Sequence, residues 1–365
     1  MSVPKLTHVA GTFLVQASGA FLNGAGLGEG ENRNVTIPKT FRDGRDLVPY
    51  VSAQAWKRWL RNTLIEETGW MPSVLKPIGS PSVRGTTTKI SGELNPVDYA
   101  EDDIFGYMRA EKGQGSKAEE DEDEEDEEGA KPEKGQRVKA VMRSSPFAAS
   151  LMVSIRKSGW QGRDEAFVHL KEGTPLPYVT EFYNTHLQAV FCLNYSRMGV
   201  FSNIGDRIEL DEKLVDDFIK DNKVKVLEDL GKSGKKYGMA DGNARAIRGR
   251  ELFKALALLR GGAKQAQFGT DVAPKAIVMA GLSCGNPIFN NVFDENVDGP
   301  VIKVNLLKEI IKDYSEKLVT PVVIGLRTGY LKNEEEVRSL GKQNGSEVFV
   351  MTPIEAARKI GEYLM

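Results

Sequence analysis

Three histidines, His8, His169 and His186, are the side chains of this sequence best suited to acid–base chemistry near neutral pH. His8 and His186 stand in strand-like patterns, where a hydrogen-bonded structural histidine is the ordinary interpretation. No serine has the setting of a nucleophile elbow, and no carboxylate–histidine spacing indicates a metal site. Cys192 and Cys284 lie in apolar segments without a CxxC partner. We therefore predict no catalytic residue, no metal and no disulfide framework.

Two glycine-rich segments could be taken for nucleotide-binding loops, but each misses a required position. In the segment from Gly24 to Gly30, the third glycine of a dinucleotide fingerprint falls on Glu29, and a predicted hairpin follows where a helix is needed. A phosphate-binding loop ending at Gly231-Lys232-Ser233 would need a glycine where Val226 stands. Both segments are better explained as flexible loops, and no cofactor is expected.

Charge is distributed very unevenly along the chain. The total of 49 basic and 51 acidic residues gives a net charge of −2, but Glu119 to Glu128 are ten consecutive acids. Without them, 49 basic residues face 41 acidic ones, a balance of +8. A run of carboxylates cannot be buried together, so we predict an unpacked acidic segment whose deletion leaves folding intact.

The basic residues gather in two places, each combining a glycine-rich loop with a helix that has a Lys/Arg face. Such surfaces bind phosphate, although each cluster alone could also be a solvated helix face. Two clusters together favour nucleic acid. Their members are Arg33, Lys39, Arg42, Arg45, Lys57, Arg58 and Arg61 in the first, and Lys232, Lys235, Lys236, Arg245, Arg248, Arg250, Lys254, Arg260 and Lys264 in the second.

Hydrophobic periodicity predicts an α+β protein. Strands are expected at 7–16, 186–195 and 276–280, and a polar hairpin at 35–48 with a turn at Asp43-Gly44. Helices are expected from an N-cap at Ser52, at 243–260 with a stop at Gly261, at 306–318, and from a capping box at Thr352 to the end. The segment 214–230 is predicted as a helical connector. Strands and helices in this order suggest a split βαβ arrangement of ferredoxin type.

The segment from Val51 to Arg61, VSAQAWKRWLR, resembles the Ser-x-Gln-x-x-Lys-Arg-x-x-Arg signature of the CRISPR-associated backbone subunits of Cascade, the "Cas seven" superfamily. The preceding HVAGTFLVQASGAFLNGAG and the later GGAKQAQF (Gly261 to Phe268) are similar to its DevR branch, found in type I-B and related systems. The likeness from about residue 7 to 61 is specific, and that from about 180 to 268 is moderate.

This resemblance implies a modified ferredoxin-like, RNA-recognition palm with a helical insertion and a β-hairpin thumb. It also implies a non-catalytic protein that polymerises along the guide part of a CRISPR RNA, contacting neighbouring copies of itself and other Cascade subunits. The guide then pairs with target DNA. The sequence lacks the RNP aromatic signature of ordinary RNA-recognition motifs, which agrees with backbone binding in which base pairing carries specificity.

Functional residues carry over position by position. The signature residues should face the RNA backbone, whereas Trp56 and Leu60 should be core. The loop lining the guide and the second cluster add further candidates. The full RNA-binding set is Asn23, Arg33, Asn34, Lys39, Ser52, Gln54, Lys57, Arg58, Arg61, Arg245, Arg248, Lys264 and Gln265. Relatives that cut target RNA carry an aspartate before the signature helix; here that neighbourhood reads Gly-Glu-Asn-Arg-Asn at 30–34, so no nuclease role is implied.

The expected organisation is a palm in two halves, 1–70 and 182–285, an insertion at 71–144 with a disordered acidic stretch, a thumb at 145–181 and a C-terminal extension at 286–365. Trp160, Phe167 and Tyr178 are candidates for the wedge by which the thumb displaces a base.

Two other functions stay open: an RNA-processing endoribonuclease using a histidine such as His8 or His186, and a stand-alone regulatory RNA-binding protein. No apolar run approaches the roughly 20 residues that cross a bilayer, and the N-terminus reads as a strand. We therefore expect a cytoplasmic protein with no membrane partner.

Overall fold

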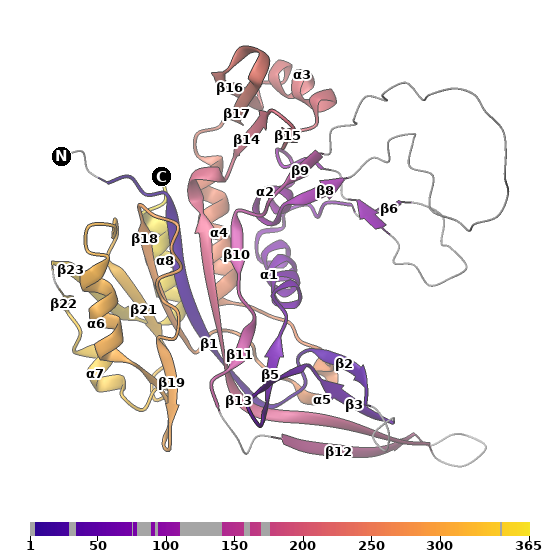
Figure 1. The fold of residues 1–365 in the computed structure, drawn as a ribbon, viewed down its shortest axis with the longest axis vertical. Helices are drawn as coiled ribbons and strands as arrows, with labels where there is room; N and C mark the ends of the chain where they lie inside the picture. The colour runs from indigo at the N-terminus through magenta and orange to yellow at the C-terminus, as the bar shows by residue number, and fades with distance from the viewer. Residues whose placement is uncertain are drawn as a thin grey trace, which may run out of the picture. The chain divides into compact units, whose positions relative to one another are not determined.

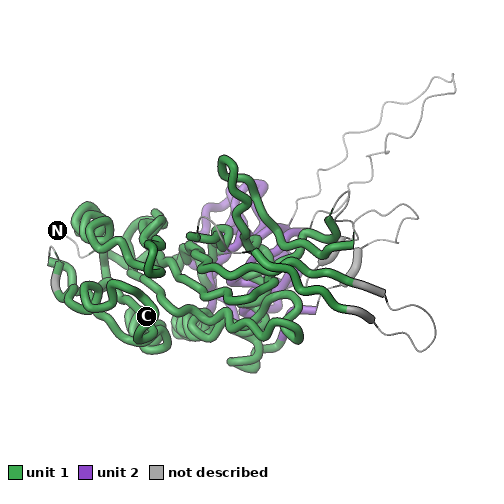
Figure 2. Tube along the Cα trace, turned by 90° about the horizontal axis from the view of Figure 1, so that it is seen from below, with its two compact units in different colours: residues 1–71, 146–198, 243–365 green, residues 72–145, 199–242 purple. Residues whose placement is uncertain are grey.

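The computed structural model describes residues 4–28, 34–74, 76–78, 89–91, 94–109, 141–156, 161–168, 176–343 and 345–365. The acidic run at 119–128 lies outside these residues. The chain forms two compact units, the first built from 1–71, 146–198 and 243–365, and the second from 72–145 and 199–242 (Figure 2). No helix in the described part of the chain has the length and apolarity needed to span a membrane.

Unit 1 has a βαββαβ arrangement at its centre. The four strands lie in the sheet order β18-β1-β13-β11, helix α1 follows the first strand along the chain, and α4 follows the third. All three pairings are antiparallel. This is the ferredoxin-like topology, so the predicted α+β class and palm fold are confirmed. The elements are β1 (His8–Ala20), α1 (Ala53–Thr68), β11 (Met152–Ser154), β13 (Leu176–Asn194), α4 (Ala244–Ala257) and β18 (Ala276–Leu282).

The sheet extends at both sides of this palm. Strands β21 (Val322–Leu326), β23 (Ser346–Met351) and β22 (Lys342–Gln343) continue it beyond β18. Strands β5 (Asp46–Val51) and β4 (Thr40–Asp43) continue it beyond β11, and β10 (Phe147–Ala149) pairs with β13. Among the described residues, β4 and β22 form the two ends of this path.

Helix α1 forms because Ser52 caps it and its apolar residues recur at helical spacing. The Ser52 side chain accepts a hydrogen bond from the Ala55 N–H, and Gly69 closes the helix in a left-handed conformation. Trp56 is fully buried, in edge-on contact with Phe13 (5.4 Å) and Phe147 (5.8 Å). Its indole N–H donates to the Ser150 carbonyl at 2.8 Å. Burial of both Trp56 and Leu60 confirms their predicted core role.

The opposite face of the sheet is covered by the C-terminal part of the chain. Ala10, Leu14 and Val278 point to this face and pack with Phe289 and Leu307. The covering elements are β19 (Phe293–Asn296), β20 (Gly299–Ile302), α6 (Val304–Asp313) and α7 (Glu334–Arg338), whereas α8 (Pro353–Glu362) packs on α4, β18 and β21. Helix α8 begins with the predicted capping box of Thr352 and Glu355.

A long hairpin leaves the palm at the far end of β13. Strand β12 (Gln161–Val168) pairs with the first part of β13, and β3 (Val35–Pro38) pairs in parallel with its other edge (Figure 1). Strand β2 (Gly24–Leu27) pairs with β3. The local order β12-β13-β3-β2 places the loop after β1 beside the hairpin.

Unit 2 is built on a sheet with the order β16-β17-β14-β15-β9-β8. Arg143 is fully buried there between Asp103 and Glu209 and stacks on the Phe201 ring. The elements are β6 (Lys76–Ile78), β7 (Lys89–Ser91), α2 (Ala100–Phe105), β8 (Tyr107–Arg109), β9 (Val141–Arg143), β14 (Val200–Ile204), β15 (Arg207–Ile208), α3 (Glu212–Lys220), β16 (Val224–Asp229) and β17 (Gly234–Met239).

Several predicted elements differ from the structure. The connector at 214–230 is helical only to Lys220, and β16 follows it as an edge strand. Helix α4 ends at Ala257, before the predicted stop at Gly261, and Ile247 is 46% exposed although its spacing predicted burial. The hairpin turn at Asp43-Gly44 is present between β4 and β5, but Val35 belongs to a different strand pair.

Candidate nucleic-acid interface

The four polar signature residues of α1 form one stripe along the helix. At 100° per residue, Gln54, Lys57, Arg58 and Arg61 span an arc of about 100°, on the side opposite Trp56. Gln54 and Arg58 are exposed, and Lys57 and Arg61 are half-buried. Burial lowers the pKa of Lys57, because a charged ammonium loses solvation there. An RNA phosphate at this position would oppose that shift.

The two ends of α1 differ in charge. Its first turn contains no acidic residue, and the Ser52 backbone N–H is held by the Asn23 side-chain oxygen at 3.0 Å. The acids of this helix lie in its last turns, where Glu66 and Glu67 pair with Arg260. The partial positive charge of the helix N-terminus and the Lys/Arg stripe therefore favour the same negatively charged ligand.

The GGAKQAQF segment packs directly against the signature helix. Gly261 has a φ of 153°, and a Cβ there would overlap the Trp59 ring. The Ala263 N–H donates to the Leu22 carbonyl at 2.9 Å, which ties the segment to the end of β1. The two motifs that carried the family resemblance are thus neighbours in space.

Lys264 bridges this loop to the hairpin. It has a left-handed backbone, its ammonium donates to the Thr180 hydroxyl at 2.5 Å, and it lies 5.3 Å from the centre of the Phe21 ring. The Gln265 side chain donates to the Gly261 carbonyl, within the loop that begins α5 (Gln265–Phe268). The contacts of Lys264 with Thr180 and Phe21 could not be read from the sequence.

The loop residues Asn34 and Lys39 lie in the same neighbourhood. The Lys39 N–H donates to the Asn23 carbonyl at 2.8 Å. Asn34 is exposed and directly precedes Val35, which pairs with Val179 on β13. Tyr178, one residue earlier on β13, is therefore beside Asn34 and is 40% exposed.

The structure brings most predicted RNA-binding residues together, and separates two. Helix α4 has 14 residues and is about 21 Å long. Arg245 and Arg248 lie in its first two turns, whereas Lys264 follows the other end of the helix. Arg245 stacks on Tyr195 at 4.7 Å and donates to the Met365 carbonyl, and Arg248 is only 6% exposed. Because its side chain is buried, Arg248 is unsuited to binding an RNA backbone.

Three predicted residues lie wholly or partly outside the described residues. Arg33 and the wedge candidate Trp160 lie outside the described residues. Phe167 pairs through its backbone with Pro177 in the β12–β13 hairpin, but its side chain is outside the described part.

The described histidines occupy structural positions. The His186 ring bonds to the Tyr330 hydroxyl at 2.7 Å through Nδ1, and His8 Nδ1 lies 2.9 Å from the Thr7 hydroxyl. Burial lowers the pKa of both, so each is neutral at neutral pH. Burial also raises the pKa of Cys192 to about 11. Within the described ranges, no three His, Cys, Asp or Glu side chains gather as a metal site.

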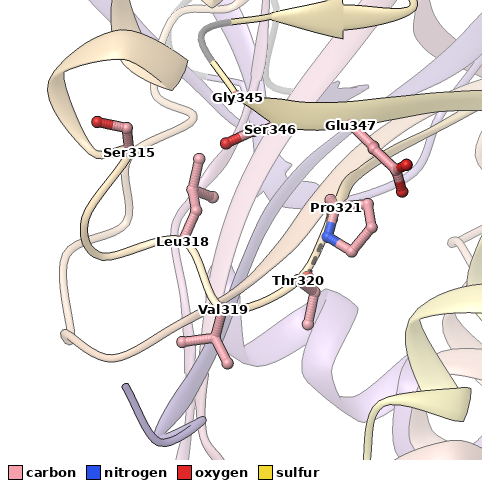
Figure 3. A pocket seen from close by; sticks show the side chains of 8 residues that line it. All are labelled: Ser315, Leu318, Val319, Thr320, Pro321, Gly345, Ser346 and Glu347. Carbon is pink, nitrogen blue, oxygen red and sulfur yellow. Dashed lines mark hydrogen bonds between the residues drawn. The ribbon is translucent and has the colours of Figure 1, made fainter. Parts of the chain in front are cut away.

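A hollow of about 480 Å³ lies away from these residues, between the loop before β21 and the start of β23 (Figure 3). Its lining includes Ser315, Thr320 and Ser346 but no basic side chain; Glu347 is its one charged group. It is unsuited to a nucleic-acid backbone.

No family model matches the sequence, and no curated protein matches it. Among solved structures, the chain is similar to one from a "CRISPR RNA-guided surveillance complex, pre-nicking", with 10% identity, a TM-score of 0.56, and coverage of 98% of this chain and 100% of that one. It also resembles one from a "CRISPR RNA-guided surveillance complex" at 11% identity and a TM-score of 0.48, covering 98% of this chain and 99% of that one. The first likeness shows that the chain has the fold of that complex subunit over its whole length.

Proposed function

We propose that this protein is a non-catalytic backbone subunit that polymerises along the guide part of a CRISPR RNA in a cytoplasmic type I surveillance complex. The full-length likeness to a chain of a "CRISPR RNA-guided surveillance complex, pre-nicking" carries the proposal. The likeness in fold is independent of the signature at 52–61, and both point to the same class of protein.

The guide would be held by its phosphates. We define the guide-binding surface as the α1 stripe, the residues around its N-terminus and the first residues of α5. Its members are Asn23, Asn34, Lys39, Ser52, Gln54, Lys57, Arg58, Arg61, Lys264 and Gln265, with Arg33 as a further candidate. Ammonium, guanidinium, amide and hydroxyl groups donate to phosphate oxygens without reading the bases. Arg245 and Arg248 are left out because of where they lie.

The β12–β13 hairpin would act as the thumb. It is adjacent to the guide-binding surface, because Lys264 bonds to Thr180 and the Gln267 side chain bonds to Asp164 on β12. Tyr178 is the wedge candidate with a described, exposed side chain beside the guide loop. An aromatic ring in this place can stack on a base and hold it out of line.

Specificity would come from pairing between the guide and target DNA, with each copy contacting its neighbours and other Cascade subunits. A protein that grips only the backbone leaves the base edges free for this pairing. Purified protein mixed with a CRISPR RNA should bind unrelated guide sequences with similar affinity and leave the RNA intact. RNA cleavage that persists in chelator and is lost in His186→Ala would instead support an endoribonuclease. Tight binding to one sequence alone would support a regulatory RNA-binding protein.

A further inference from the structure

One stretch of the palm sheet remains open on the face opposite α1 and α4. Neighbouring strands place Gln188, Val153 and Tyr50 opposite one another, so their side chains form one row across β13, β11 and β5. All three are half-buried. The next residues along each strand, Leu187, Met152 and Val51, are fully buried on the helix side.

Aromatic and apolar groups are exposed along this row. Phe41 on β4 is 38% exposed, and its ring lies 5.9 Å from that of Tyr50. The register pairs Phe41 with Val48, two residues before Tyr50, so both rings lie on the open face. Leu151 is 43% exposed and shares this face with Val153. The face therefore presents two aromatic rings, tilted by 57° to each other, beside aliphatic groups.

Neutral amides border the same surface. A hollow of about 400 Å³ lies over β11 and β13, lined by Leu151, Val153, Gln188, Asn290 and Asn291 with other residues of these segments. Asn290 and Asn291 are exposed, and among the described residues neither side chain has a hydrogen-bond partner. Amides of Asn and Gln match the donor and acceptor edges of nucleobases. No charged side chain lines this hollow, so a phosphate would not be preferred inside it.

Positive charge stands at the edge of the aromatic surface. Arg45, in the turn after β4, is exposed and forms no ion pair with a described residue, whereas Arg42 pairs with Leu47 and points to the other face of the hairpin. The Arg45 guanidinium can bind the backbone of a strand whose base enters the face. Among the described residues, only Phe41 and Leu151 expose much apolar surface on this face. That is little for a protein partner, since stable interfaces cover about 800 Å² per partner.

We propose that this open face binds an unpaired base of a single-stranded nucleic acid, with the base against the Phe41 and Tyr50 rings and its edge bonded by Asn290 and Asn291. The site lies across the sheet from α1, which packs through Trp56 on the buried side. The strand bound here is therefore a different segment from the guide backbone held by α1. This assignment goes beyond the proposed function, and neither requires the other.

Photo-crosslinking tests the proposal. A short single-stranded oligomer carrying 5-iodouracil is bound to the full chain, irradiated, and the crosslinked peptide identified by mass spectrometry. Crosslinks are expected at Phe41 or Tyr50. Stacking makes a double change of Phe41→Ala and Tyr50→Ala weaken binding on the order of tenfold. Leu47→Ala is the matched control, because Leu47 is 39% exposed on the other face of the same hairpin.

Three results would overturn the proposal: crosslinks confined to α1 or the 261–268 loop, equal weakening by the Leu47 control, or concentration-dependent self-association that the double variant abolishes. If the alanine variant unfolds, Phe41→Leu with Tyr50→Leu keeps the apolar contacts and removes the rings. The same assay on a Lys57, Arg58 and Arg61 triple alanine variant separates the two proposals. If Tyr50 still crosslinks in the triple variant, and the wild-type protein does not bind guide RNA, the base site is supported and the guide-binding function is refuted.

Discussion

Replacing Lys57, Arg58 and Arg61 together by alanine tests how the α1 stripe binds RNA. If each side chain neutralises one phosphate of a single strand, the slope of log affinity against log salt becomes shallower by about 2, at about 0.7 per phosphate. Over a fourfold rise in salt, wild-type affinity should then fall about 20-fold more than that of the variant. The loss should be the same for unrelated guide sequences, because phosphates carry no sequence.

Fluorescence anisotropy with labelled guide RNAs of different sequence, measured at several salt concentrations, gives both the slope and its dependence on sequence. A triple alanine variant of Lys308, Lys312 and Lys317, on and after α6, is the matched control, since it removes the same charge elsewhere in unit 1. An unchanged slope in the stripe variant, an equal change in the control, or a loss confined to one RNA sequence would refute the backbone-grip reasoning.

Three other predictions concern stability and loop position. Trp56→Ala should lower the free energy of unfolding by about 3–5 kcal/mol, because a fully buried ring and its hydrogen bond to Ser150 are lost; a loss below about 1.5 kcal/mol in urea titration would contradict the packing described. Burial keeps the pKa of His186 below its unfolded value, so its contribution to stability is complete above about pH 6.5 and is lost as the pH falls through the folded pKa. His186→Gln should therefore flatten the fall in melting temperature between neutral and acidic pH, and an unchanged pH profile would count against it. Gly261→Ala should weaken guide binding, because a Cβ must push the loop bearing Lys264 away from Trp59, whereas Gly341→Ala, with open space around it and no left-handed backbone, should not; equal effects would show that loop position is unimportant.

Local signals predicted the starts of α1 and α8 and the core positions of α1. Ser52 and the Thr352–Glu355 box act through hydrogen bonds within one turn, so nearby residues determine them. The burial of Trp56 follows from helical spacing alone. Strand β16 was missed because an edge strand exposed on both faces has no alternation of apolar and polar residues.

The candidate site was predicted less completely. Basic residues that are close in sequence need not be close in space. Arg245 lies in the first turn of α4, whereas Lys264 follows the other end of this helix. Arg248 is buried through tertiary contacts that a single sequence does not reveal. The contact between Gly261 and Trp59 likewise depends on how two distant segments fold together.

The number of protein copies bound to RNAs of increasing length tests the central claim most directly. Native mass spectrometry of complexes with guide RNAs of several lengths gives this number without assumptions about shape. The proposed function predicts that copy number rises linearly with RNA length, by a constant number of nucleotides per copy, with the RNA uncut. One copy per RNA at every length would contradict it.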